Sequence, residues 1–333
     1  MRYRLLLLAG LFLVPLTQTP VTRAQIATRP LQAASRTASV PALLTHAQAA
    51  FDKKDYVTAE ALFTQATMLA PRNAVAWAGK ARSDSYLGDD TDAVVDYTTA
   101  VRYAPANAIY YMRRAISYDR LEDAPHALAD YSTAIRLAPD NADTYFNRAS
   151  FYYNHGQYAA AIPDNTQAIR LRPTWWQAYF DRGEDENQVD LFQAAISDLT
   201  KYIQHTARAD CGCAYTERGN AYFSLGKYTQ ALADYEQAIA IGPAGYGEYN
   251  NYGVAAYLLR KYAPAISSLT TAIGFDPNDA RAYYYRGLAR RDSGDKLDAI
   301  TDEQQAVQLY TQQGDSARAQ QAAAVLRQLQ AAS

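Results

Sequence analysis

The sequence predicts an all-α protein, an α-solenoid of eight helix-turn-helix repeats of 34 residues followed by a C-terminal capping helix. Each interval of 34 residues contains two helical stretches separated by a turn, which often has a glycine, as at Gly88, Gly156, Gly226 and Gly294. Prolines recur with the same spacing, at Pro71, Pro105, Pro139 and Pro173 and again at Pro243 and Pro277. A fixed period of this size is typical of stacked helical hairpins.

Residues 1–24 have the layout of a secretory signal peptide. Two arginines precede an apolar run from Leu5 to Leu16, and a polar stretch follows that ends at Ala24. A helix needs about 20 apolar residues to cross a bilayer, so a cleaved signal is favoured over a permanent anchor. We therefore expect an exported protein, periplasmic or extracellular, with no integral membrane span in the mature chain. Residues 25–39 lack periodicity and are predicted to be a flexible linker.

The proline spacing divides residues 40–313 into eight repeats. Pro173 and Pro243 are 70 residues apart, so one repeat carries a two-residue insertion. Residues 314–333 have the alanine and leucine spacing of an amphipathic helix, and terminal repeats need a polar outer face, so this tail is predicted to be a capping helix. The predicted repeats are 40–73, 74–107, 108–141, 142–175, 176–211, 212–245, 246–279 and 280–313.

Each predicted repeat combines bulky and small side chains in a constant pattern. The second helix has an alanine followed four positions later by a large residue, most often tyrosine or leucine. The first helix has an aromatic followed four positions later by a small residue, which places a bulky group beside a notch on one helical face. The small residues are Ala81, Ala115, Ala149, Gly183, Gly219, Gly253 and Gly287.

This pattern resembles the tetratricopeptide repeat family over residues 40–313. The resemblance implies antiparallel helix pairs stacked into a right-handed superhelix, with the first helices lining the concave side. Asn165 and Glu303 depart from the pattern, because they occupy the place of the large residue of the second helix. Pro163 lies about one turn inside a second helix and is expected to kink or delay it.

Six repeats have a basic residue in the first helix and an aspartate sixteen positions later. The two remaining repeats lack both residues, so pairing within a repeat leaves no residue unmatched. We therefore predict structural ion pairs between the two helices of a repeat, rather than an anion-binding site. The pairs are Lys80 with Asp96, Arg114 with Asp130, Arg148 with Asp164, Arg182 with Asp198, Arg218 with Asp234, and Arg286 with Asp302.

The sequence offers little that points to catalysis. A net charge of −2 without basic blocks argues against nucleic-acid binding. The common metalloprotease, hydrolase and nucleotide-binding motifs are absent from the sequence, and the four histidines fall in four different repeats. We predict that the protein is not an enzyme and has no cofactor and no metal site.

Cys211 and Cys213 lie at the junction that carries the insertion, with His205 upstream. Three interpretations are open: a structural or strained disulfide, two ordinary thiols, or a metal or redox site. Residues two apart on a helix point in different directions, so a disulfide here would be strained. Zinc held by these three residues would lack a clear fourth ligand.

The predicted function is a protein–protein interaction scaffold that binds a peptide or protein partner in the concave groove. A structural subunit of an envelope or surface assembly, which would use convex or terminal surfaces, is the alternative. Aromatic, amide and charged residues on a second stripe of the first helices suit a peptide ligand, although the rings could instead pack between helices. The stripe does not match the lysine and asparagine clamp with which some family members hold a terminal carboxylate. Its residues are Phe146, Tyr153, Phe180, Glu184, Asn187, Asn220, Phe223, Asn250, Tyr257, Tyr284 and Arg291.

Overall fold

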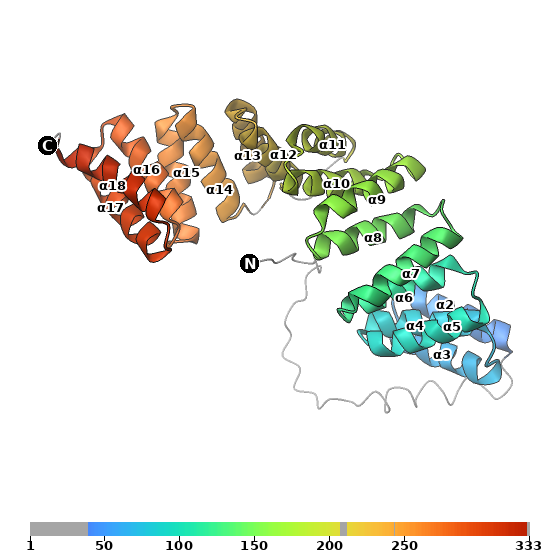
Figure 1. The fold of residues 1–333 in the computed structure, drawn as a ribbon. Helices are drawn as coiled ribbons and strands as arrows, with labels where there is room; N and C mark the ends of the chain where they lie inside the picture. The colour runs from blue at the N-terminus through green and yellow to red at the C-terminus, as the bar shows by residue number, and fades with distance from the viewer. Residues whose placement is uncertain (1–38, 207–211, 243, 332–333) are drawn as a thin grey trace, which may run out of the picture. The chain divides into compact units, whose positions relative to one another are not determined.

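A computed structural model describes residues 39–206, 212–242 and 244–331 of the protein. Every regular element in these ranges is an α-helix, and the helices follow one another as antiparallel hairpins (Figure 1). The all-α repeat fold predicted from the sequence is confirmed. The predicted signal peptide, most of the predicted linker, and Cys211 lie outside the described residues.

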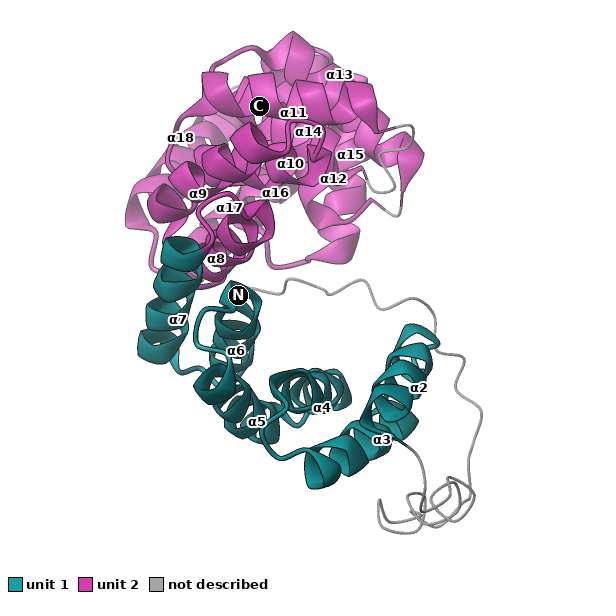
Figure 2. Cartoon of the chain, turned by 90° about the vertical axis from the view of Figure 1, so that its right-hand side faces the viewer, with its two compact units in different colours: residues 1–137 teal, residues 138–333 magenta. Residues whose placement is uncertain are grey.

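The helices form two compact units, which divide between Leu137 and Ala138 (Figure 2). Unit 1 has three hairpins, and its helices are α2 (Val40–Asp52), α3 (Tyr56–Leu69), α4 (Ala74–Leu87), α5 (Asp90–Tyr103), α6 (Ala108–Arg120) and α7 (Ala124–Leu137). Unit 2 has five hairpins and a last single helix. Its helices are α8 (Ala142–Asn154), α9 (Tyr158–Leu171), α10 (Trp176–Gln188), α11 (Phe192–His205), α12 (Cys213–Ser224), α13 (Tyr228–Ile241), α14 (Tyr246–Leu258), α15 (Tyr262–Phe275), α16 (Ala280–Ser293), α17 (Lys296–Gln312) and α18 (Ser316–Ala331).

Short polar residues begin many of these helices. The side chains of Asn73, Asn107 and Asn141 each accept a hydrogen bond from a backbone N–H two or three positions on. Such N-caps satisfy N–H groups that have no partner within the helix. At the other end of a first helix, Gly88 and Gly294 adopt left-handed φ values of 88° and 95°, which end the helix and turn the chain back.

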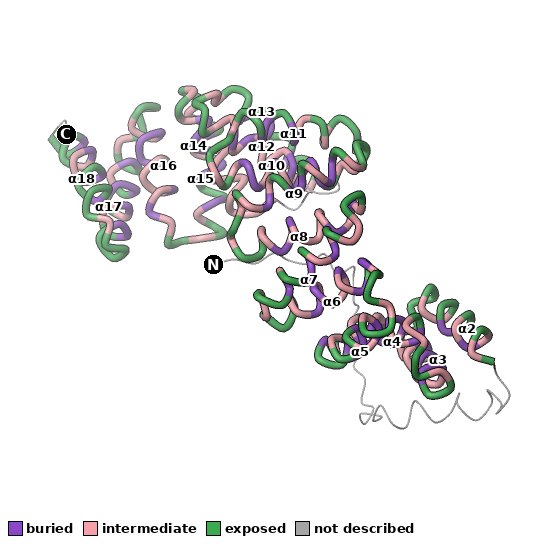
Figure 3. Tube along the Cα trace, turned by 45° about the vertical axis from the view of Figure 1, so that its right-hand side comes forward, coloured by how far each residue is buried: buried purple, intermediate pink, exposed green. Residues whose placement is uncertain are grey.

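The notches predicted on the first helices receive the large side chains of the second helices. A Cβ atom on Gly219 would lie 2.8 Å from the ring of Tyr235, and one on Gly183 would lie 2.8 Å from Leu199. Tyr235 and Leu199 are both fully buried. The absence of a side chain on these glycines therefore allows the two helices of a repeat to approach closely. Figure 3 shows that the buried segments lie on the helices and that the turns are mostly exposed.

Two departures from the repeat pattern have visible consequences. Asn165 is buried and donates a hydrogen bond of 2.9 Å to the Asp185 carboxylate in the next repeat, so a polar pair replaces an apolar contact. Pro163 lies inside α9, yet α9 begins at Tyr158, so the expected delay of this helix is wrong. The proline removes one helical N–H, which would otherwise point at the carbonyl of Ala159.

The tail forms the helix α18, which packs against the last hairpin. Val325 and Leu329 are buried in a cluster with Leu288 and Ala299. This contact covers an apolar side of α16 and α17.

Candidate functional site

The predicted ion pairs join the two helices of each of the six repeats. The aspartate side chains are at most 9% exposed, so the pairs lie between the helices rather than on the outer surface. Lys80 pairs with Asp96. The shortest N–O distances of the others are 2.6 Å for Arg114–Asp130 and Arg148–Asp164, 2.5 Å for Arg182–Asp198, and 2.7 Å for Arg218–Asp234 and Arg286–Asp302.

Four of these arginines also reach back to the preceding repeat. Each donates a hydrogen bond from a terminal nitrogen to a threonine hydroxyl on the second helix of that repeat. The guanidinium group therefore fixes the position of three helices with a single side chain. The bonds are Arg114 to Thr98 (2.9 Å), Arg182 to Thr166 (2.9 Å), Arg218 to Thr200 (3.0 Å) and Arg286 to Thr270 (3.1 Å).

The asparagines of the predicted binding stripe make hydrogen bonds inside unit 2, two of them to a neighbouring repeat and Asn250 to Asp279 at the start of α16. Asn187 donates to the Glu217 carboxylate (3.0 Å), and Asn250 donates to Asp279 (3.0 Å). Asn220 accepts hydrogen bonds from the Tyr235 hydroxyl (2.9 Å) and from Asn251 (3.1 Å). These amides are thus already engaged in contacts within and between repeats.

Most aromatic residues of the same stripe also contact other helices. Phe180 is only 8% exposed and belongs to a core cluster with Leu199. Glu184 is half-buried on α10. The other contacts are Phe146 with Trp175, Tyr153 with Tyr158, Phe223 with Tyr228, Tyr257 with Tyr285, Tyr284 with Tyr310, and Arg291 with Asp292.

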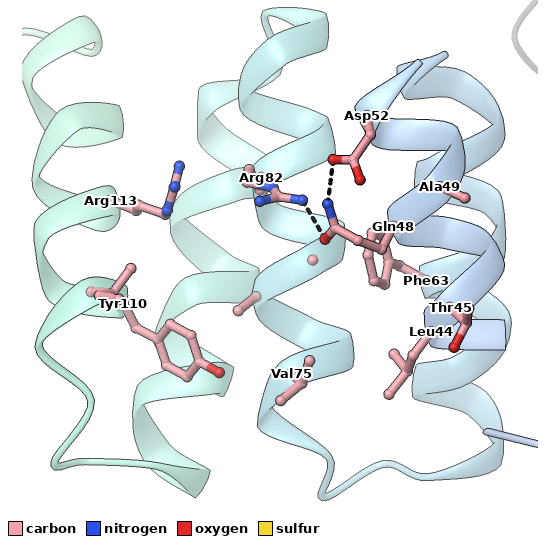
Figure 4. Close-up of a pocket in the computed structure, with 13 residues that line it drawn as sticks. Leu44, Thr45, Gln48, Ala49, Asp52, Phe63, Val75, Arg82, Tyr110 and Arg113 are labelled. Atoms are coloured by element: carbon pink, nitrogen blue, oxygen red, sulfur yellow. Dashed lines mark hydrogen bonds between the residues drawn. The ribbon is translucent and has the colours of Figure 1, made fainter. Parts of the chain in front are cut away.

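A recess of about 750 Å³ lies in unit 1, on α2, α4 and α6, the first helices of the three repeats. We call it the unit 1 groove. Figure 4 shows its lining side chains on three adjacent helices, with Phe63 of α3 behind them. It is lined by Leu44, Thr45, Gln48, Ala49, Asp52, Phe63, Val75, Ala78, Gly79, Arg82, Ile109, Tyr110 and Arg113.

The groove has an apolar row and a polar row, and both run across the three helices. Tyr110, Val75 and Leu44 form the apolar row in Figure 4, one from each helix. Val75 and Ile109 of the lining are 56% and 46% exposed, so two branched apolar side chains within one recess face solvent. A ligand that covered them would remove apolar surface from water.

The polar row contains Arg113, Arg82, Gln48 and Asp52 (Figure 4). Arg82 donates to Gln48 (2.8 Å), and Gln48 donates to Asp52 (2.6 Å). The guanidinium of Arg82 also lies over the ring of Phe51, 3.6 Å from its centroid. These contacts hold Arg82 in place without neutralising its charge.

Arg82 and Arg113 have no ion-pair partner among the described residues. Burial lowers the pKa of Arg82, and the neighbouring charge of Arg113 lowers it further. The Nε atom of Arg82 is buried and has no hydrogen-bond partner within the described part of the chain. Two partly buried cations therefore lie close together and lack an anion.

The residues of this groove are not among those predicted from the sequence. Leu44, Gln48 and Arg82 lie on the same second stripe that was traced in the later repeats, so the stripe, continued into the first two repeats, would have indicated them. Arg113 lies outside that stripe, and its position beside Arg82 depends on how the repeats stack.

Little in the described residues suggests catalysis. They contain no group of three or more histidine, cysteine, aspartate or glutamate side chains placed to hold a metal ion. His205 stacks on Trp176, with 4.0 Å between ring centroids. Cys213 is part of a disulfide, while Cys211 lies outside the described residues. No helix in the described ranges has the length and hydropathy of a membrane span.

Solved structures share this fold. The C-terminal part of a tetratricopeptide repeat-containing protein from Cytophaga hutchinsonii superposes with a TM-score of 0.59 at 18% identity, covering 72% of this chain and 97% of that one. A tetratricopeptide repeat protein from Parabacteroides merdae superposes with a TM-score of 0.51 at 20% identity, covering 75% of this chain and 98% of that one. Identities this low show the fold alone.

Sequence relatives match over shorter stretches. The Hsp70-Hsp90 organizing protein of Triticum aestivum is 30% identical over 82 residues, which is 25% of this chain, and RNA polymerase II-associated protein 3 of Xenopus tropicalis is 34% identical over 93 residues, which is 28% of this chain. The chain spans 14% of the length of each of these relatives.

Family models describe the repeats directly. Models of the tetratricopeptide repeat match residues 142–174, 212–244 and 253–314, and a TPR repeat model matches residues 120–156. Proteins of this family generally mediate protein–protein interactions. The matches identify residues 120–174, 212–244 and 253–314 as tetratricopeptide repeats, and the eight helical hairpins have the corresponding length.

Proposed function

We propose that the protein is a non-enzymatic scaffold that binds a segment of a protein partner in the unit 1 groove. The observation that carries this proposal is a recess of about 750 Å³ in which exposed apolar side chains lie beside two arginines without an ion-pair partner in the described chain. Its volume is in the range typical of ligand sites. Apolar side chains would supply contact area, and the polar row would orient the segment.

Unit 2 has a different role in this proposal. Its stripe of asparagines and aromatic rings is engaged in contacts within and between repeats, which favours a stiff array over an open binding surface. The Arg–Asp–Thr contacts strengthen the same array. We therefore place the partner on unit 1, and not on the eleven stripe residues predicted from the sequence.

Crosslinking tests where the partner binds. A photoreactive phenylalanine analogue replaces Ile109 in the groove or, as a control of similar exposure, Val95 on α5, a second helix outside the groove lining. In the cells that produce the protein, we expect a crosslinked partner from position 109 and none from position 95. The reverse result would favour the alternative function, a structural subunit that uses its convex surface.

We also propose that the protein is exported, on the evidence of the arginines and the apolar run in residues 1–24. N-terminal sequencing of the native protein tests this proposal. A chain that begins at Gln25 is expected, whereas a native chain that retains Met1 would refute cleavage.

A further inference from the structure

We propose that the segment bound in the unit 1 groove is acidic and amphipathic. An aspartate or glutamate side chain of the partner binds between Arg82 and Arg113, and apolar side chains of the same segment cover Val75 and Ile109. This inference rests on the proposed function of the groove and adds the chemical class of its ligand.

The charge of the groove points to an acidic ligand. Arg82 and Arg113 are the cations of the lining, and Asp52 is its one carboxylate. Asp52 lies on α2 and accepts a hydrogen bond from Gln48; its charge favours the charged form of Arg82, but it forms no salt bridge with either arginine. Between α4 and α6 the field is therefore positive. A carboxylate there would meet two guanidinium groups whose partly dehydrated state strengthens a charge-assisted hydrogen bond.

Arg82 keeps donor groups available for a ligand, while Arg113 also has a hydrogen bond with the hydroxyl of the buried Tyr97. Arg82 uses one terminal nitrogen for Gln48, and its other terminal nitrogen donates no hydrogen bond among the described residues. The ring of Phe51 supports the flat face of the guanidinium and leaves its edge free to donate. Arginine can present two parallel N–H groups to one carboxylate, which a lysine cannot do.

The two rows also determine which side of the ligand is apolar and in which direction the ligand binds. Because the apolar row and the polar row both run across α2, α4 and α6, a segment that crosses the helices would present one apolar side and one polar side. Asp52 at the α2 end repels an anion, so the acidic residue of the ligand belongs at the α4–α6 end. An acidic segment of this kind would thus bind in one direction.

The chain's own linker has the wrong charge for this site. Residues 25–38 contain Arg29 and Arg36 and no aspartate or glutamate. Two cationic residues would face Arg82 and Arg113 if this linker occupied the groove. The ligand is therefore a segment of another protein.

Selection from a library of random dodecapeptides displayed on phage tests the inference. The purified full-length protein is the target, and enriched sequences are made as synthetic peptides whose affinity is measured by fluorescence anisotropy. We expect the enriched peptides to contain aspartate or glutamate close to leucine, isoleucine or phenylalanine. Changing the acidic residue of a peptide to its amide should weaken binding about ten- to hundredfold.

Substitutions in the protein test whether Arg82 and Arg113 bind the acidic residue of the peptide. Arg82→Gln combined with Arg113→Gln should weaken binding to a similar extent, while Arg102→Gln, an exposed position on α5, should not change it. Thermal melting followed by circular dichroism checks that each variant is folded. If the double variant does not fold, the peptides whose acidic residue is changed to its amide still test the inference, because they are measured with the natural protein.

The possible failures are distinguishable. Enriched peptides that need no acidic residue, yet lose affinity when Ile109→Asp places a charge among the apolar lining residues, would overturn the acidic ligand and leave the groove as the binding site. Failure to obtain any peptide that Ile109→Asp weakens would overturn both proposals.

Discussion

Glu303 is a carboxylic acid in the core of unit 2, where most other repeats have a tyrosine or leucine. Its side chain is fully buried beside Gly287, and neither carboxyl oxygen has a hydrogen-bond partner among the described residues. Burial raises the pKa of Glu303 to about 8, the charge of Arg291 opposes this rise, and the charge of Asp302 adds to it. Glu303 is therefore protonated in the folded protein at neutral pH.

The raised pKa makes stability depend on pH in a defined direction. In the unfolded chain the carboxyl group ionises near its ordinary value of 4.5, while in the folded chain it keeps its proton up to about pH 8. Between these values the folded state binds one more proton, so the free energy of unfolding falls as pH rises, by about 1.4 kcal/mol per pH unit. The loss is complete above the folded pKa and amounts to roughly 5 kcal/mol.

Glu303→Leu removes this loss because leucine has no ionisable group. Leucine also fits this site, since it occupies the equivalent position in two other repeats, at Leu199 and Leu269. We expect the variant to be more stable than the natural protein at pH 8, and the difference between the two to shrink by several kcal/mol on going to pH 5. Glu303→Gln is the matched control. It cannot ionise, so it should lose the same pH dependence, but its buried amide should leave it less stable than the leucine variant.

Urea unfolding at pH 5, 6.5 and 8, followed by circular dichroism, measures these differences, and comparison with the natural protein cancels the contribution of other titrating groups. Hydrogen exchange in α16 and α17 provides a local measurement, since a repeat array can unfold in parts. A leucine variant that keeps the pH dependence of the natural protein between pH 5 and 8 would refute the reasoning.

Three further tests probe the packing of the repeats, each by urea unfolding. Gly219→Ala should destabilise the protein by about 1–3 kcal/mol, because the added methyl group meets the buried ring of Tyr235. Gly274→Ala is the control: its Cβ meets no atom within 4 Å, so it should stabilise by about 0.5–1 kcal/mol, and equal effects of the two changes would contradict the predicted notch. Arg218→Asp or Asp234→Arg alone should each cost roughly 3 kcal/mol, and the double swap should recover part of this loss; no recovery would refute the pairing. Pro163→Ala should stabilise α9 by about 1–3 kcal/mol by restoring a helical hydrogen bond, and a loss of stability would show that the ring fills a needed space.

Features that repeat along the chain could be read from the amino-acid order. The proline period gave the number of hairpins, and the spacing of sixteen residues gave ion pairs such as Arg148–Asp164. These features depend on short distances along the chain, within one hairpin whose geometry every repeat shares. The packing of Leu199 against Gly183 across the two helices was predictable for the same reason.

Contacts between repeats were not predictable in this way, because they depend on how one hairpin stacks on the next. Asn165 departs from the repeat pattern in the sequence, and the structure shows that it hydrogen-bonds to Asp185 of the following repeat. Asn187 and Asn250 looked like ligand-binding amides, but stacking gives them partners inside the protein. Arg82 and Arg113 lie in different repeats, and only the packing of α4 against α6 brings two cations together without a neutralising carboxylate. The positive groove therefore results from tertiary structure, since its charge comes from side chains that are distant in the sequence and share no recurring spacing.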